Sequence, residues 1–78
     1  MKELYTAIVY KDWESTVIPC CTLMEIRDMK VAEHFEAADF WDYLGMSHEE
    51  LLEEPITEDF ILHVLKYDYL YAELIKEN

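Results

Sequence analysis

The sequence contains few residues that break or cross-link a chain: one Gly, two Pro and two Cys among 78 residues. A single Gly leaves no Gly-rich loop to hold a nucleotide phosphate. The patterns G-x-x-x-x-G-K-S/T, G-x-G-x-x-G, G-x-S-x-G and H-E-x-x-H are all missing from the sequence. These absences exclude the common nucleotide-dependent enzymes, and we expect a protein that is not an enzyme and needs no cofactor.

The two cysteines, Cys20 and Cys21, are adjacent. A disulfide between them would be strained and would join no distant parts of the chain, so we expect reduced thiols. The apolar runs fall short of the roughly 18 residues of a membrane-spanning helix. Residues 1–3 lead into no signal-peptide pattern. We therefore expect a cytoplasmic protein without a membrane contact.

Apolar residues are plentiful, at 53% of the chain, and 14% of the residues are aromatic. This composition differs from that of disordered segments, so the chain is expected to fold. A chain of this length is close to the lower limit for an independent core and makes a single domain, residues 1–78. Because small domains often add a partner subunit to a thin core, a homodimer stays open.

The first part of the chain has the composition of β-strands. Leu4–Tyr10 and Ser15–Ile18 are rich in β-branched and aromatic residues and are separated by a short polar break. They predict a β-hairpin within residues 1–20, and Pro19 predicts that the second strand ends there or lies at a sheet edge. Two strands alone are marginally stable, so helices must pack against them.

The rest of the chain has the signals of helices. We expect a helical segment over residues 22–45, interrupted near Asp28–Lys30 and ended by Gly45, then a short helix over 47–54 and a C-terminal helix over 57–77. The residues expected to cap these helices are Thr22, Ser47 and Thr57. The predicted fold class is α+β, with an N-terminal β-hairpin packed against three to four α-helices in one small domain.

Residues 67–71, Tyr-Asp-Tyr-Leu-Tyr, also show the two-residue period of a strand. The caps and the length of the segment favour a helix. On such a helix Asp68 projects among apolar residues, where an unpaired carboxylate is costly. We expect its partner to be a Tyr or Trp hydroxyl or indole within the fold, or a group at a protein interface.

The net charge of −12 lies mainly in the middle of the chain. Residues 1–30 are close to neutral, whereas Val31–Leu65 contains ten acids and no Lys or Arg. A role in solubility is the alternative explanation for this acidic segment. Exposed protein surfaces usually mix both signs, so the absence of bases favours a binding role. The candidate partner-binding residues are Glu33, Glu36, Asp39, Asp42, Glu49, Glu50, Glu53, Glu54, Glu58 and Asp59.

The same charges indicate the kind of partner. Affinity for phosphate comes from Lys and Arg, of which the chain has six, so no direct nucleic-acid binding is expected. A basic protein that itself holds DNA or RNA suits the acidic segment. On the expected helix, Glu36, Asp39 and Asp42 rise about 4.5 Å per step, a spacing comparable to the roughly 3.4 Å between phosphates along one DNA strand.

In their acidic composition, residues 33–59 resemble the small phage-encoded inhibitors that mimic nucleic acid, anti-CRISPR proteins among them. The resemblance lies in the composition and in the carboxylates on outward helical faces. It implies an inhibitor or decoy whose acidic surface occupies the basic groove of a nuclease or CRISPR-type effector and blocks access of DNA or RNA.

Two other functions remain open. An adaptor or antitoxin-like module would bind through apolar anchors on an aromatic-rich surface. A small metal-dependent hydrolase would need His34 or His48 to face two carboxylates, for example His34 with Glu33 or Asp42. Neither these His residues nor His63 has the paired spacing of a ligand motif, so no metal site is predicted. The aromatic residues of the first alternative are Trp13, Trp41, Tyr67, Tyr69 and Tyr71.

Overall fold

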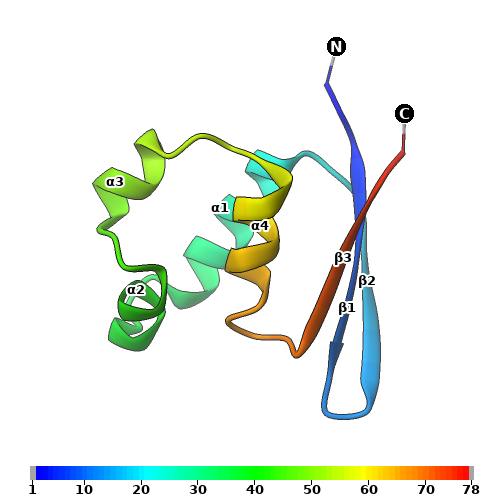
Figure 1. Cartoon of the computed structure of the whole chain (residues 1–78), viewed down its shortest axis with the longest axis horizontal. Helices are drawn as coiled ribbons and strands as arrows, with labels where there is room; N and C mark the ends of the chain where they lie inside the picture. The colour runs from blue at the N-terminus through cyan, green and yellow to red at the C-terminus, as the bar shows by residue number, and fades with distance from the viewer. Residues whose placement is uncertain (1, 78) are drawn as a thin grey trace.

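The computed structural model describes residues 2–77 and has an α+β architecture, as predicted. A three-stranded antiparallel sheet forms one layer, and four helices lie together on one side of it (Figure 1). The strands are β1 (Tyr5–Lys11), β2 (Glu14–Cys21) and β3 (Tyr71–Lys76). The helices are α1 (Leu23–His34), α2 (Ala38–Leu44), α3 (His48–Glu53) and α4 (Glu58–Leu65).

The sheet is built around β1, with the strand order β2-β1-β3. In β1 the buried residues Tyr5, Ala7 and Val9 alternate with half-buried ones, as expected for a strand with one face on the core. The hairpin of β1 and β2 is confirmed. The expectation for Pro19 is also confirmed, because β2 is an edge strand, where a residue without an amide proton is tolerated.

A β-bulge lies near the end of β2. Tyr5 pairs with Cys21 and Ala7 pairs with Ile18, so Pro19 and Cys20 together stand opposite Thr6. Neither cysteine is in a disulfide, as predicted. Cys20 is exposed, whereas Cys21 is half-buried, and burial raises the pKa of its thiol.

The three helix caps are formed as expected. The Thr22 and Ser47 side chains take part in complete capping boxes, and the Thr57 hydroxyl accepts a hydrogen bond from the amide of Phe60. The interruption of the first helical segment, however, lies between α1 and α2 and not at Asp28–Lys30. At Ala37 the backbone is extended, with φ −86° and ψ 106°.

The helix that follows this break packs against the other helices. Phe40 and Leu44 of α2 are buried in the cluster between them. The indole of Trp41 donates a hydrogen bond of 2.9 Å to the carbonyl of Phe35, an acceptor at the end of α1. No helix found between residues 2 and 77 has the length and apolar character needed to cross a membrane.

The predicted C-terminal helix over 57–77 is wrong in its second half. Helix α4 ends at Leu65, and Tyr71–Lys76 form β3, which pairs antiparallel with β1. In β3, Ala72 and Leu74 face the core while Tyr71, Glu73 and Ile75 are exposed, a period of two. The strand satisfies backbone groups on the second side of β1, a long-range gain that outweighed the local helix signals.

Two clusters of buried side chains make up the core, and α4 contributes to both. Helix α4 is therefore central to the fold. Between the sheet, α1 and α4 lie Ala7, Val9, Ile26, Ile61, Leu65 and Ala72. Between the four helices lie Val31, Phe40, Leu44, Leu51 and Val64.

Gly45 ends α2 in the left-handed conformation, with φ +71°, and its amide donates to the carbonyl of Trp41 at 2.8 Å. A Cβ at this position would meet no atom within 4 Å, so only the backbone penalty applies. We expect Gly45→Ala to lower the free energy of unfolding by about 1 kcal/mol, measured by urea denaturation. Gly45→Asn should lose less, because Asn tolerates this conformation; equal stability of Gly45→Ala and the native chain would contradict this account.

Candidate functional site

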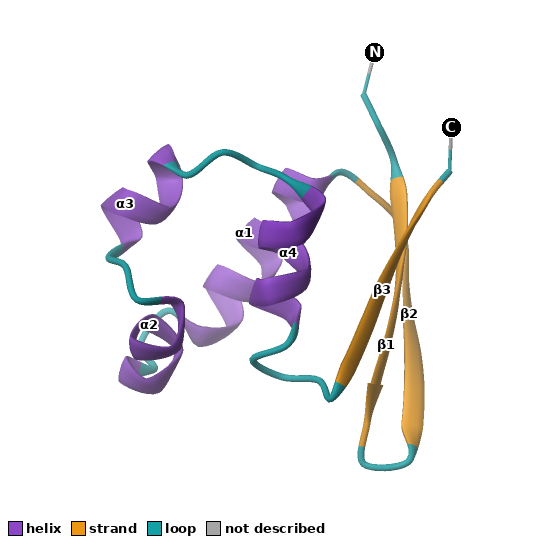
Figure 2. Ribbon diagram, in the orientation of Figure 1, coloured by secondary structure: helices purple, strands orange, loops and turns teal. Residues whose placement is uncertain are grey.

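The ten acids of the acidic segment are all exposed. They run from the last turn of α1 to the first turn of α4, and most are carried by α2, α3 and the turns beside them. Figure 2 shows that α2 and α3 form the part of the helical layer furthest from the sheet. The acidic segment is therefore concentrated at the end of the molecule opposite the strands.

Most of these carboxylates lack a partner. Among the described residues, Glu33 alone of the ten pairs with a Lys or Arg, at 3.2 Å from Lys30. Two others accept structural hydrogen bonds: Glu50 from the amide of Ser47, and Glu58 from the hydroxyl of Tyr5. Seven acids have a carboxylate that forms neither an ion pair nor a hydrogen bond within residues 2–77. These residues, called the unpaired acids below, are Glu36, Asp39, Asp42, Glu49, Glu53, Glu54 and Asp59.

The predicted helical row of Glu36, Asp39 and Asp42 is only partly correct. Asp39 and Asp42 lie on α2, with Phe40 and Leu44 buried on its other side. Glu36 lies in the break before α2, so a regular helical rise does not apply to it. The three side chains are all exposed, but they do not form one evenly spaced row along a helix.

The predicted aromatic-rich surface does not form as one surface. Trp41 and Tyr67 are half-buried and pack against the cluster between the helices, and Tyr69 packs against the cluster under the sheet. Only Trp13 and Tyr71 are more than half exposed, at 92% and 53%. They lie on the sheet side of the molecule, where the sequence reasoning missed Leu70, which is 79% exposed.

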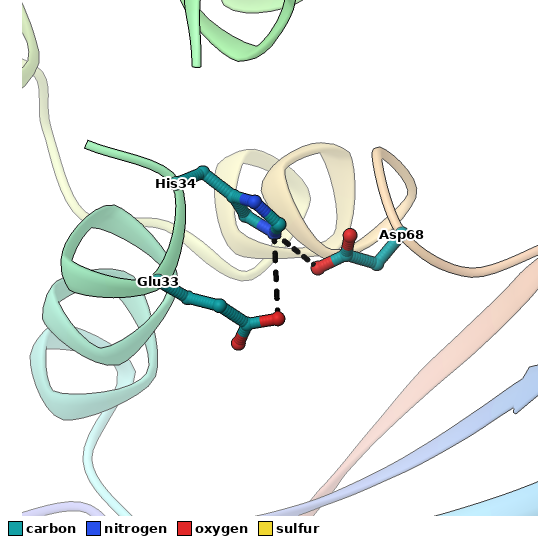
Figure 3. Close-up of side chains that lie close together, drawn as sticks. All are labelled: Glu33, His34 and Asp68. Atoms are coloured by element: carbon teal, nitrogen blue, oxygen red, sulfur yellow. Dashed lines mark hydrogen bonds and ion pairs between the residues drawn. The ribbon is translucent and has the colours of Figure 1, made fainter. Parts of the chain in front are cut away.

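A polar cluster joins α1 to the segment between α4 and β3 (Figure 3). The expected partners of Asp68, Tyr or Trp, are wrong: its carboxylate lies 3.1 Å from the Lys30 ammonium and 2.7 Å from Nε2 of His34. Lys30 is only 3% exposed. It also donates to the hydroxyl of Tyr69 at 3.2 Å. With Glu33, Asp68 and Tyr69 as acceptors, the buried ammonium group has a partner for each of its three protons.

The pKa values in this cluster favour the charged forms. For Asp68, burial opposes ionisation, but hydrogen bonds from His34 and Lys30 and their charges outweigh burial and lower the pKa. For Lys30, burial likewise opposes the charge, and hydrogen bonds with Tyr69 and Asp68 outweigh it and raise the pKa. The two groups therefore hold each other ionised.

Part of the requirement for a metal site is met here. One ligand atom each from Glu33, His34 and Asp68 lies within 4.8 Å of the others, whereas Asp42 is not part of this group. Figure 3 shows the three side chains converging from α1 and from the segment after α4. However, the Lys30 ammonium already lies 3.1–3.2 Å from both carboxylates and would repel a divalent cation placed between them. The cluster is best explained as a structural ion pair.

The other two histidines have aromatic neighbours. His48 is half-buried, with ring centroids 5.1 Å from Phe35 and 5.8 Å from Trp41. His63 is exposed and stacks on Tyr43 at 4.6 Å. Neither belongs to the group of possible ligands found in the described part of the chain.

The ion pair gives a prediction for Asp68→Asn, which removes the charge and keeps the shape. Leaving the buried Lys30 with only the exposed Glu33 as its counter-ion should lower the free energy of unfolding by about 2–4 kcal/mol at pH 7. Because the pKa of Asp68 is lowered on folding, its stabilisation is present above the unfolded pKa of about 4 and is lost as the pH falls through the folded value. Urea denaturation across this range measures the difference between the two proteins.

The matched control is Asp39→Asn, which removes an equal charge from an exposed side chain. Its stability should stay within about 0.5 kcal/mol of the native protein. If Asp68→Asn cost no more than this control at pH 7, the ion pair would not be a determinant of the fold.

Comparisons with protein-family models, with curated proteins and with solved structures found no match to this chain. A function can therefore be argued only from the chain's own surface and its charges. Two features of the surface contribute little to the packing of the fold. They are the unpaired acids on the helical layer and the exposed aromatic side chains beside the sheet.

Proposed function

We propose that this chain is a non-enzymatic inhibitor that binds a basic nucleic-acid-binding protein, such as a nuclease or CRISPR-type effector, and blocks its access to DNA or RNA. The observation that carries the proposal is the exposure of all ten acids of the segment, nine of them without a Lys or Arg partner in residues 2–77. Carboxylates arranged in this way can occupy positions that phosphates occupy in a basic groove.

Electrostatics gives a reason for such binding. Like charges held on a small surface repel one another, and within residues 2–77 the chain's own bases pair with only Glu33 of the ten acids. The bases that form ion pairs are used elsewhere: Arg27 with Asp28, Lys76 with Glu3, and Lys30 mainly in the interior. A partner rich in Lys and Arg would relieve the repulsion and would also be attracted over a distance.

The competing explanation is that the acids only keep the protein soluble. Under that explanation the position of the acids has no importance, and only the net charge matters. A comparison of charge reversals at two places on the molecule separates the two explanations.

We expect Asp39, Asp42 and Glu53 changed together to Lys to weaken binding about tenfold or more. The matched control changes Glu14, Glu73 and Glu77 to Lys, which alters the net charge by the same amount at the sheet and should leave binding nearly unchanged. Its only structural cost among the described residues is the exposed hydrogen bond from the Tyr71 hydroxyl to Glu73. Binding is measured by biolayer interferometry against purified nucleases and CRISPR-type effectors from 50 to 300 mM NaCl, with duplex DNA as competitor. Higher salt and added DNA should both weaken it.

Equal losses in the two triple variants would favour the role in solubility. Binding that persists at every salt concentration, or that DNA does not displace, would rule out the proposed function. Glu50 and Glu58 are left unchanged because their carboxylates accept hydrogen bonds within the fold.

A further inference from the structure

A small cleft lies at the end of the sheet where β1 turns into β2. Its volume is about 230 Å³, and it is lined by Tyr10, Asp12, Trp13 and Leu70. The amide of Leu70 donates to the carbonyl of Tyr10 at 2.9 Å, which fixes the chain before β3 against the hairpin. In Figure 1 this end of the hairpin is far from α2 and α3, so the cleft is separate from most of the unpaired acids.

The turn that forms the cleft is strained. Asp12 and Trp13 connect paired residues Lys11 and Glu14, and both have positive φ, +50° and +72°. Two-residue turns of this kind favour Asn and Gly, and a bulky residue in this conformation is unfavourable. The Trp13 side chain is 92% exposed, so burial in the fold does not compensate for the strain. A residue that is costly in its position and contributes little to the core is a candidate for function.

The cleft has the chemistry of a site for a planar cation. The phenol of Tyr10 and the indole of Trp13 offer aromatic faces, which attract cations, and Leu70 adds apolar contact. Asp12 supplies a negative charge, and its carboxylate has neither an ion pair nor a hydrogen bond among residues 2–77. The volume is below the range of about 300–1,000 Å³ typical of sites for whole small molecules, which suits a single side chain.

We propose that this cleft binds an arginine side chain of a partner protein. A guanidinium is planar and weakly hydrated, stacks on aromatic rings and donates paired hydrogen bonds to a carboxylate, so it matches each group that lines the cleft. The assignment does not depend on the unpaired acids. A partner that engages both would meet the chain at two separate places.

The test is a titration followed by ¹H–¹⁵N NMR with N-acetyl-L-arginine methylamide as the probe. Its neutral counterpart, in which citrulline replaces arginine, has nearly the same shape without the charge. We expect saturable shifts of the Trp13 indole and of the Tyr10 and Leu70 amides with the arginine probe, and none with the citrulline probe. The Trp41 indole, which is bonded to the carbonyl of Phe35, should not move.

Two variants test the residues. Asp12→Asn and Trp13→Gly should each weaken binding of the arginine probe by about two- to fivefold, followed through the Tyr10 and Leu70 amides. Since Gly adopts positive φ freely, Trp13→Gly should also raise the melting temperature by about 2–8 °C. Lost binding would then not reflect a lost fold.

Two controls separate this proposal from the proposed function. Leu52→Ala removes an exposed apolar side chain from α3 and should leave binding of the probe unchanged. The triple variant Asp39→Lys, Asp42→Lys and Glu53→Lys should also bind the arginine probe as the native protein does. Equal shifts with the citrulline probe, unchanged binding by Trp13→Gly, or shifts located in α2 and α3 instead of the cleft would overturn the assignment.

Discussion

The ion pair between Lys30 and Asp68 fixes the segment that connects the helical layer to the last strand of the sheet. Lys30 belongs to α1, and Asp68 lies in the short segment that leads from α4 into β3. Fixing this segment directs the following residues back along β1, where β3 completes the sheet. Because Lys30 is buried and its charge is satisfied by Asp68, Glu33 and Tyr69, a shift of the segment that carries Asp68 and Tyr69 would remove two of its three partners.

The burial of Lys30 also affects the balance of charge on the surface of the helical layer. The helical layer, residues 22–70, has thirteen acids and only Arg27, Lys30 and Lys66 as bases. Two of these are buried, and Arg27 pairs with its sequence neighbour Asp28. Arg27 and Lys30 are thus used within the fold, which leaves Lys66 as the exposed base of this layer. The burial of these two bases adds to the excess of acids on the helical surface.

The features that the sequence predicted correctly depend on neighbours in the chain. The capping boxes at Thr22 and Ser47, the left-handed Gly45 and the hairpin are all decided within a few residues. The break before α2 and the strand β3 depend on contacts far along the chain, with the helical core and with β1. The Lys30–Asp68 pair, 38 residues apart, has no local signal except the isolated charge of Asp68 among apolar residues.

The two candidate binding features share one physical property: each departs from what folding alone would select. Folding favours mixed charge on a helical surface and Asn or Gly in a tight turn, yet the chain has unpaired acids on α2 and α3 and Trp13 at φ +72°. Both departures attract positively charged groups, the first through carboxylates in number and the second through aromatic faces with one carboxylate. The two proposals therefore agree on the chemistry of the partner, because one protein with abundant Lys and Arg on its surface would satisfy both.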